Sequence, residues 1–204
     1  GLSSFLNDII LVDDVLIRNG GNKPEIKCFE TNLDLYLQLK YEMENVVLGE
    51  TNAFICYRNE EIRNLVIGLQ SVGEYDFGYK YSTNEGNVDT IDFAQFSTNI
   101  MTIHSAKGLE FDNVYFVCQE HAGMISEKAE NHYYSAFSRA KKNLKLYYVN
   151  YFLSNLKISK EKYIGEIKKL PHQFLDEKLK VALVESRIEM LKEMVSSNLD
   201  KEEI

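Results

Sequence analysis

The run of residues 101–117 constrains the fold most, because two apolar segments bracket a short polar loop. The apolar segments are typical of buried strands, and the loop between them spans residues 104–112. Strands followed by short polar turns place those turns at the carboxyl edge of an α/β sheet, where ligands bind. Lys107 and Gly108 add a cation beside a backbone that can approach a phosphate closely. The run therefore predicts an α/β fold with a ligand-binding loop.

Apolar periodicity predicts further strands and helices on both sides of this run. We expect strands at residues 26–29, 53–57, 75–81, 91–96 and 144–149, and helices at residues 2–19, 31–45, 60–71 and 128–139. Residues 82–90 are polar and predict a loop. Alternating strands and helices predict a mostly parallel sheet with helices on both faces.

The end of the chain has a different pattern. From residue 154 onward the sequence is helical in character, with Pro171 and an acidic tail at residues 200–203. We therefore expect one α/β domain over residues 1–153 and a helical C-terminal extension over residues 154–204.

Composition excludes several classes of protein. No apolar run approaches the roughly 18 residues of a membrane span, and no leader marks a secretory signal, so we expect a cytoplasmic chain without membrane contact. Cys28, Cys56 and Cys118 lie singly in apolar surroundings, which predicts buried thiols rather than disulfides or a metal site. The net charge of -8 argues against a domain that grips nucleic acid by bulk electrostatics. Any contact with DNA must be local.

Three motifs, in the expected order, resemble those of the UvrD/Rep/PcrA-like superfamily I helicases. Residues 101–117 resemble motif V, residues 134–144 (Y-S-A-F-S-R-A-K-K-N-L) resemble motif VI, and residues 52–59 (N-A-F-I-C-Y-R-N) resemble motif IV. The resemblance implies a RecA-like fold of the P-loop NTPase type. It also implies that the parent protein is an ATP-dependent DNA helicase.

Two further features indicate a fragment of such a helicase. No G-x-x-x-x-G-K-[ST] sequence occurs, and no strand ends in an Asp-Glu pair that would hold Mg²⁺. The resemblance then implies the second RecA-like domain, with the ligands for Mg²⁺ and most contacts to ATP in an N-terminal RecA-like domain of the same parent. About forty residues separate motifs IV and V, so the large insertion domain of the family is absent or reduced. We expect the isolated fragment to be inactive.

The resemblance assigns nucleotide contacts to four side chains. Arg139 resembles an arginine finger, and Arg58 resembles a second contact to the γ-phosphate. Both roles suit a side chain that is always charged and bidentate. Tyr57 would stack on adenine, and Glu110 would accept hydrogen bonds from the ribose hydroxyls. The plain alternatives are surface arginines paired with acids, a core tyrosine and a helix-start carboxylate.

Other positions match loop and DNA contacts of the family. Lys107 and Gly108 would shape the loop beside the phosphates. Thr102 and His104 match positions that touch the backbone of single-stranded DNA, where each can donate one hydrogen bond without reading sequence. A locally satisfied histidine is the alternative for His104. Tyr79, Tyr81 and Phe93 are further aromatic candidates for base stacking, with core packing as the alternative.

The sequence also departs from the family pattern. Residues 130–131 are Glu-Asn where the family usually has two arginines, Ser138 replaces a threonine, and Arg63 follows Arg58 by five residues instead of six. These differences weaken the expectation of full unwinding activity. The implied activity of the parent is ATP hydrolysis coupled to 3′-5′ translocation on single-stranded DNA, in a repair, recombination, plasmid or phage context. Two alternatives stay open: a helicase–nuclease of the RecB or AddA kind, and a helicase-like ATPase that remodels a protein complex such as RNA polymerase.

Overall fold

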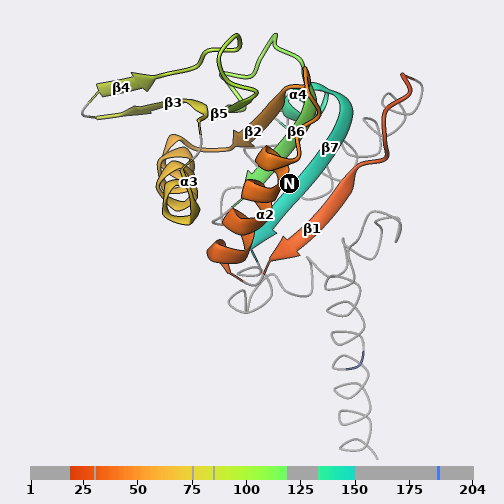
Figure 1. The fold of residues 1–204 in the computed structure, drawn as a ribbon, viewed down its shortest axis with the longest axis horizontal. Coiled ribbons are helices and arrows are strands. Elements are labelled where there is room, and N and C mark those ends of the chain that lie inside the picture. The colour runs from red at the N-terminus through yellow and green to blue at the C-terminus, as the bar shows by residue number, and fades with distance from the viewer. Residues whose placement is uncertain are drawn as a thin grey trace, which may run out of the picture.

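The structure, a computed structural model, describes residues 19–29, 31–74, 76–84, 86–118 and 133–149, together with Ile188. The strands are β1 (Glu25–Phe29), β2 (Asn52–Cys56), β3 (Gly78–Thr83), β4 (Gly86–Asp89), β5 (Thr98–Thr102), β6 (Phe111–Cys118) and β7 (Ala140–Val149). The helices are α2 (Asn32–Glu44), α3 (Asn59–Val72) and α4 (Tyr133–Phe137). The strands form a seven-stranded sheet in the order β1-β7-β6-β2-β5-β3-β4 (Figure 1). Neighbouring strands are parallel except β3 and β4, which confirms the mostly parallel α/β sheet.

Helix α2 begins at a capping box. The Thr31 hydroxyl accepts a hydrogen bond from the backbone N–H of Asp34 at 3.1 Å, and the Asp34 carboxylate accepts one from the Thr31 N–H at 3.2 Å. Leu35 and Leu39, four residues apart, are fully buried against the sheet. The predicted second helix is therefore confirmed, and its cap is Thr31.

A buried carboxylate fixes α2 over β6 and β7 of the sheet. Glu42 accepts hydrogen bonds from the hydroxyls of Tyr115 (2.9 Å) and Tyr147 (2.5 Å), and from the ammonium group of Lys145 (3.0 Å). Burial alone would raise the pKa of Glu42, but the hydrogen bonds from Tyr147 and Lys145 outweigh it and lower the pKa below its ordinary value. These bonds tie α2 to β6 and β7 with a directional contact that apolar packing cannot provide.

Helix α3 follows β2 through a turn that Glu61 holds. The Glu61 carboxylate accepts hydrogen bonds from the backbone N–H groups of Tyr57 and Arg58, each at 2.9 Å. Further along, Gly68 lies against the ring of Tyr36 in α2, where an added Cβ would come within 2.2 Å of the ring. The absence of a side chain at Gly68 lets the two helices pack closely on one face.

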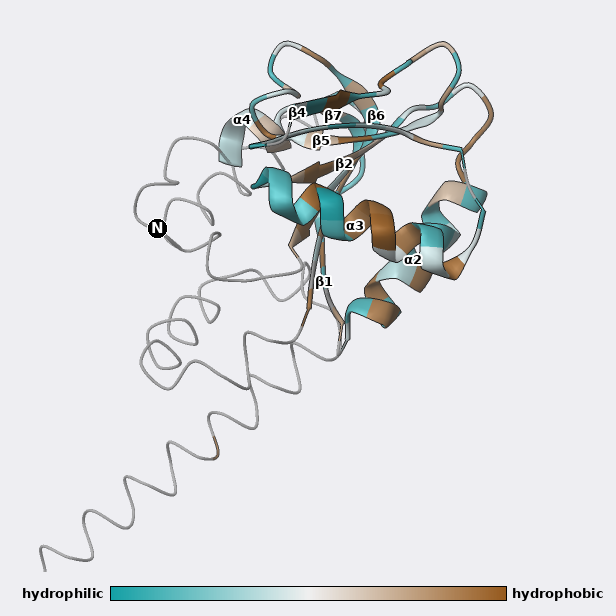
Figure 2. Ribbon diagram, turned by 90° about the vertical axis from the view of Figure 1, so that its left-hand side faces the viewer, coloured by the Kyte–Doolittle hydropathy of each residue, from teal (hydrophilic) through white to brown (hydrophobic). Residues whose placement is uncertain are grey.

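The two faces of the sheet carry different helices. Tyr115 packs edge-on against Tyr147 (ring centres 5.7 Å apart) and belongs to the core beneath α2 and α3. The next residue, Phe116, packs against Tyr133 (5.8 Å) and Phe137 (5.5 Å) of α4. Because successive strand residues point to opposite faces, α4 lies on the face opposite α2 and α3 (Figure 2). Helices on both faces are therefore confirmed.

Two predicted elements between residues 82 and 96 are wrong. Residues 82–90 were expected to be a loop, but residues 82–83 complete β3 and residues 86–89 form β4, with Tyr81 opposite Val88 in an antiparallel hairpin. Residues 91–96 were expected to be a strand, but they form a turn in which the Asp92 carboxylate accepts hydrogen bonds from the N–H groups of Ala94 (2.8 Å) and Gln95 (3.1 Å). An aspartate side chain that bonds its own backbone competes with strand pairing.

Other predictions fall partly or wholly outside the described residues. Of the helix expected at residues 128–139, residues 133–137 are helical and residues 138–139 form a turn before β7. The helix expected at residues 2–19 lies almost entirely outside the described part of the chain. The extension expected at residues 154–204 also lies outside it, apart from Ile188.

Candidate functional site

The carboxyl ends of β2 and β5 bring together four of the expected site residues. Cys56 and Thr102, the last residues of the two strands, are partners in the parallel register. Tyr57 and Arg58 follow Cys56 directly, and His104 lies two residues beyond Thr102. We name this group the carboxyl-edge cluster: Tyr57, Arg58, Thr102 and His104.

Arg58 and His104 expose their polar groups in this cluster, whereas the other two side chains are engaged. The Arg58 guanidinium lies 6.0 Å from the centre of the Tyr57 ring, and that ring lies 6.3 Å from the ring of Tyr133. Thr102 is only 9% exposed, and its hydroxyl accepts a hydrogen bond from the Ser105 N–H at 3.2 Å. Thr102 therefore shapes the loop that follows it.

The eight residues 103–110 connect β5 to β6 without a helix, and we name them the crossover loop. Backbone hydrogen bonds hold successive tight turns: Ala106 N–H to the Thr102 carbonyl (3.0 Å), and Lys107 N–H to the His104 carbonyl (3.3 Å). Gly108 has a φ of 83°, a left-handed conformation that favours glycine. Lys107 and Gly108 are exposed on the outside of this loop.

The far end of the crossover loop lies at the amino edge of the sheet. Glu110 is exposed and directly precedes Phe111, the first residue of β6. The Phe111 N–H donates to the Arg139 carbonyl at 2.9 Å, and Phe111 pairs with Ala140 at the start of β7. Glu110 and Arg139 therefore lie at the starts of two neighbouring strands. We name these two residues the amino-edge pair.

The Arg139 guanidinium joins the crossover loop to α4. Its Nε donates to the Ser135 carbonyl at 2.9 Å, its Nη1 to the Leu109 carbonyl at 3.3 Å, and its Nη2 to the Ser138 hydroxyl at 3.1 Å. A guanidinium has five N–H donors, so two of them have no partner among the described residues. Arg139 is partly exposed, and these two donors suit a phosphate or carboxylate oxygen.

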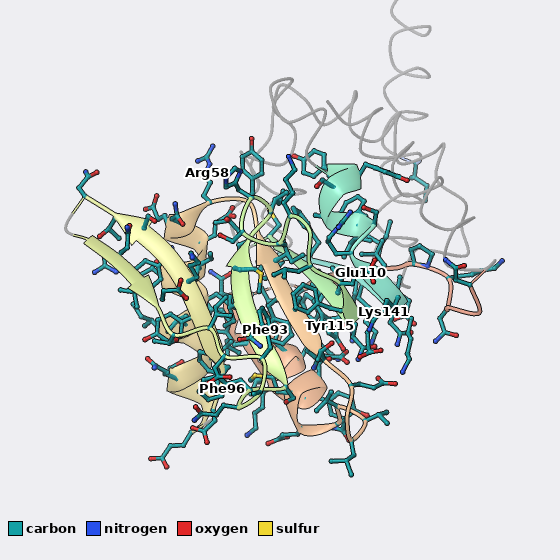
Figure 3. The ribbon with its side chains drawn as sticks, turned by 90° about the horizontal axis from the view of Figure 1, so that it is seen from above. Arg58, Phe93, Phe96, Glu110, Tyr115 and Lys141 are labelled. Atoms are coloured by element: carbon teal, nitrogen blue, oxygen red, sulfur yellow. The ribbon has the colours of Figure 1, made fainter. Side chains whose placement is uncertain are left out.

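The two groups lie at opposite ends of the strands. Phe111 marks the amino-edge pair, and Phe116 pairs with Ile55 just before the carboxyl-edge cluster. Five residues of strand between them correspond to about 16 Å. Figure 3 shows Arg58 well apart from Glu110. The structure therefore divides the expected site into two groups.

The aromatic residues that were candidates for base stacking also lie in different parts of the structure. Tyr79 and Tyr81 stack on each other, with ring centres 6.0 Å apart, and both pack partly buried against the core. Phe93 is 46% exposed, and its ring contacts that of Phe111 at 5.9 Å. The sequence could not place Phe93, because its segment was expected to be a strand and not a turn at the amino edge.

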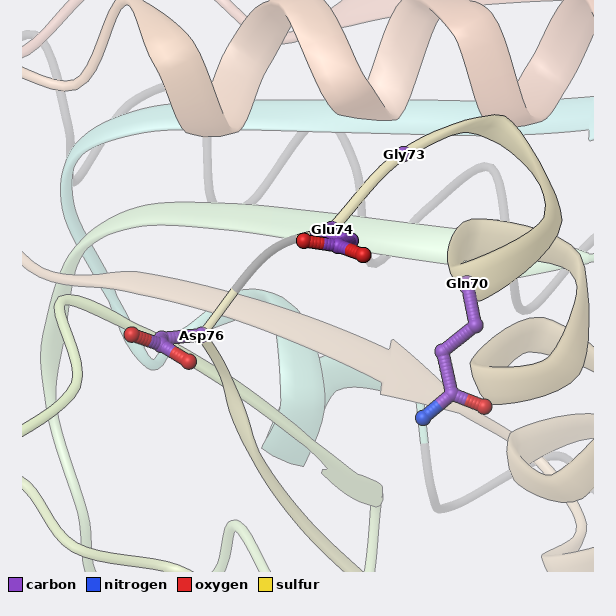
Figure 4. Close-up of a pocket in the computed structure, with 4 residues that line it drawn as sticks. All are labelled: Gln70, Gly73, Glu74 and Asp76. Atoms are coloured by element: carbon purple, nitrogen blue, oxygen red, sulfur yellow. The ribbon is translucent and has the colours of Figure 1, made fainter.

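A hollow near the end of α3 has a volume of about 470 Å³ and is lined by Gln70, Gly73, Glu74 and Asp76 (Figure 4). Two carboxylates without a described cation disfavour a phosphate ligand there. Among the described residues, no group of three or more potential ligands could hold a metal ion. None of the described helices is long and apolar enough to cross a membrane.

Comparisons with known proteins agree with this architecture. Residues 82–151, which contain the crossover loop and Arg139, match the sequence model of a family described as UvrD-like helicase C-terminal domain. The crystal structure of the C-terminal domain of a possible DNA helicase from Lactobacillus plantarum WCFS1 has a similar fold. It has a TM-score of 0.50 and 22% sequence identity, and the match covers 72% of this chain and 83% of that chain. The search of curated proteins found no match.

Proposed function

We propose that this chain, whose residues 82–151 match the model of the UvrD-like helicase C-terminal domain family, is the second motor domain of an ATP-dependent DNA helicase. Its parent would couple ATP hydrolysis to 3′-5′ movement along single-stranded DNA. A preceding RecA-like domain would supply the phosphate loop and the ligands for Mg²⁺. The crossover loop carries the proposal, because eight residues connect two separate groups of exposed polar side chains.

The amino-edge pair fits a nucleotide. The two N–H donors of Arg139 that have no partner among the described residues can bind phosphate oxygens, and the exposed Glu110 carboxylate can accept hydrogen bonds from ribose hydroxyls. Bound ATP supplies the phosphoryl group whose transfer to water releases the free energy for movement. Arg139 would stabilise the negative charge that develops on the terminal phosphate during that transfer.

The carboxyl-edge cluster fits the DNA backbone. Arg58 and His104 are exposed and can each contact a phosphate without reading a base. The resemblance assigns Tyr57 and Arg58 to the nucleotide, but their position beside His104 and away from Arg139 favours the DNA. Two local contacts are compatible with a chain of net charge -8.

The crossover loop would couple the two ligands. Lys107 and Gly108 lie between His104 and Glu110, on the outer surface of the loop. A shift of Glu110 when nucleotide binds would move His104 through only five intervening residues. For Lys107 and Gly108 we therefore propose a role in this coupling, in place of direct contact with the phosphates.

Steady-state ATPase measurements test the proposed function. We expect the full-length parent to hydrolyse ATP faster when single-stranded DNA is added, and the isolated chain to hydrolyse none. Appreciable turnover by the isolated chain would contradict the two-domain account, provided that the rate survives removal of contaminating ATPases. A parent whose ATPase ignores single-stranded DNA would contradict the DNA-driven motor.

One observation favours a second candidate, a helicase-like ATPase that remodels a protein complex. Leu33, Leu37 and Tyr41 follow one another at four-residue intervals on α2 and are 55%, 47% and 56% exposed. An exposed apolar stripe of this kind is typical of protein contacts. In the same ATPase assay, stimulation by a protein partner but not by single-stranded DNA would favour this second function.

A further inference from the structure

Exposed apolar side chains gather on α2 and on the turn that follows it. Five large ones lie in this short segment, and we name them the α2 patch: Leu33, Leu37, Tyr41, Val47 and Leu48. The other exposed large apolar side chains of the described residues are scattered along the chain: Ile67, Phe93, Tyr134 and Ile188. Single exposed apolar residues are ordinary, but five in one segment indicate a contact surface.

The helical part of the patch faces away from the sheet. Leu35 and Leu39 are fully buried against the strands, and a helix turns by about 100° per residue, so Leu37 points to the opposite side of α2. Leu33 and Tyr41 lie about one turn before and after Leu37. The three side chains form a ridge about 12 Å long at four-residue spacing. A ridge of this spacing packs into the grooves of another helix.

The end of α3 lies beside this ridge. The Lys40 ammonium group of α2 donates a hydrogen bond to the Val72 carbonyl, the last residue of α3, at 3.5 Å. Glu74 and Asp76 follow Val72 closely and line the hollow at the end of α3 (Figure 4). The second half of α2 therefore has a carboxylate-lined hollow on one side.

The charges around the patch are mostly negative. Four carboxylates lie on α2 and at the end of α3: Asp34, Glu44, Glu74 and Asp76. Lys40, the only cation in the sequence of α2, lies 4.0 Å from Glu44. On the β1 side of the helix, the Lys27 ammonium group donates to the Gln38 side chain at 2.7 Å. Because carboxylates outnumber ammonium groups, this rim attracts a basic partner and repels a second copy of itself.

We propose that the α2 patch is the docking site for an amphipathic helix of a partner protein, with lysine or arginine residues flanking its apolar face. The apolar face packs across Leu33, Leu37 and Tyr41, and Val47 and Leu48 extend the contact beyond the end of α2. The carboxylate rim selects basic helices over acidic ones. The inference goes beyond the proposed motor function, because no residue of the patch belongs to the amino-edge pair or the carboxyl-edge cluster.

Two synthetic helical peptides test the docking site. Each has about 18 residues, or five turns, with leucines at four-residue spacing along one face. One carries lysines beside the leucines, and the other carries glutamates at the same positions. Each peptide is titrated into the isotope-labelled 204-residue chain, and binding is read from NMR chemical-shift changes. The lysine peptide should shift the amide signals of residues 33–48 and bind at least about tenfold more tightly than the glutamate peptide, and added salt should reduce this difference.

Single substitutions separate the apolar contact from the charged one. Leu37→Gln removes the centre of the ridge and should weaken binding of the lysine peptide roughly tenfold. Ile67→Gln, at an exposed apolar residue of α3 outside the patch, is the matched control and should change nothing. Glu74→Gln should weaken the lysine peptide but not the glutamate peptide. All three positions are exposed, so thermal unfolding should confirm that each variant keeps the wild-type fold.

Three results would contradict the inference. If neither peptide bound, the patch would not be a docking site for a helix. If the two peptides bound equally well, or if Leu37→Gln bound the lysine peptide as tightly as wild type, the proposed apolar ridge with its acidic rim would be wrong. If the chain alone formed dimers in analytical ultracentrifugation and Leu37→Gln abolished them, the patch would be an interface between two copies and not the site of a basic helix.

Discussion

The carboxyl and amino edges of the sheet present their polar side chains in different ways. At the carboxyl edge, Arg58 and His104 follow strand ends and expose their polar groups. At the amino edge, Arg139 precedes a strand, and its guanidinium makes three hydrogen bonds to the crossover loop and α4. A side chain held in this way can contact a ligand atom at one fixed position. Exposed side chains without such bonds can contact a DNA backbone that moves past them. The difference suits the proposed function, in which the amino edge binds the nucleotide and the carboxyl edge binds single-stranded DNA.

Replacing the arginine at the amino edge should have the largest effect. In the full-length parent, Arg139→Ala should lower kcat by roughly 10³–10⁵, because the guanidinium acts on charge that grows in the transition state. The KM for ATP should change much less. Arg63→Ala, at an exposed arginine of α3, is the matched control. If kcat for Arg139→Ala stayed within about tenfold of wild type, Arg139 would have only a structural role and would not act in ATP hydrolysis.

Replacing Gly108 in the crossover loop should lower the stability of the fold and also weaken the proposed coupling between the two edges of the sheet. Gly108→Ala should cost about 1 kcal/mol, because the left-handed φ of 83° is unfavourable for alanine. Gly49→Ala is a matched control, since Gly49 has a φ of 84° and, like Gly108, open space around its Cβ position. Thermal unfolding should show similar losses in both variants, but only Gly108→Ala should reduce stimulation of the ATPase by DNA. If DNA stimulated the ATPase equally in the two variants, the proposed coupling of the two edges through the crossover loop would be contradicted.

Low pH should destabilise the fold at the amino edge of the sheet, because Asp112 then loses its negative charge. Its carboxylate accepts a hydrogen bond from the Thr51 N–H at 3.0 Å and pairs with Lys142 at 3.3 Å. Burial alone would raise the pKa of Asp112, but these contacts outweigh it and lower the pKa below the ordinary 3.8. A lowered pKa in the folded state stabilises the protein at neutral pH, and this contribution is lost as the pH falls below 3.8.

Urea unfolding at neutral pH and at about pH 3 measures this contribution. Asp112→Asn should lower stability at neutral pH by on the order of 1 kcal/mol and flatten the pH dependence. Asp76→Asn, at an exposed carboxylate before β3, should leave both unchanged. An unaltered pH dependence in Asp112→Asn would show that the carboxylate does not hold this edge.

The smallest effect is expected at the carboxyl edge. Arg58→Ala in the parent should leave kcat without DNA unchanged and remove about one phosphate contact. The salt dependence of single-strand binding should then fall by about 0.7 in log K per log salt. Arg63→Ala again serves as the control. A large fall in kcat for Arg58→Ala would indicate that Arg58 contacts the nucleotide, as the resemblance implies, and not the DNA.

The sequence predicted the sheet and its two helix-covered faces well, for identifiable reasons. The buried strands at residues 52–56 and 111–118 are mostly apolar, and the apolar residues of the helix at residues 32–44 recur at helical spacing. The expected strand at residues 75–81 overlaps β3, but the end of β3 and all of β4 were missed because their residues are mostly exposed and polar, so no apolar alternation marks them.

The site was harder to predict than the fold. All eight expected residues lie in the described part, but motif resemblance placed Arg58 and Arg139 around one phosphate. Strand direction was the available signal, because Arg58 follows a strand and Arg139 precedes one. In a parallel sheet such positions lie at opposite edges. The contact between Phe93 and Phe111 had no signal in the sequence, since it depends on the turn that Asp92 holds.

Chemical-shift mapping of the isotope-labelled chain with two ligands in turn tests the central claim, that the two edges bind different ligands. ATP should shift the amide signals of Glu110, Phe111 and Arg139, and a single-stranded oligonucleotide should shift those of Arg58 and His104. The crossover loop should respond to both. If ATP instead shifted the signals of Tyr57 and Arg58, or if both ligands shifted the same edge, the separation of nucleotide and DNA in this domain would be contradicted.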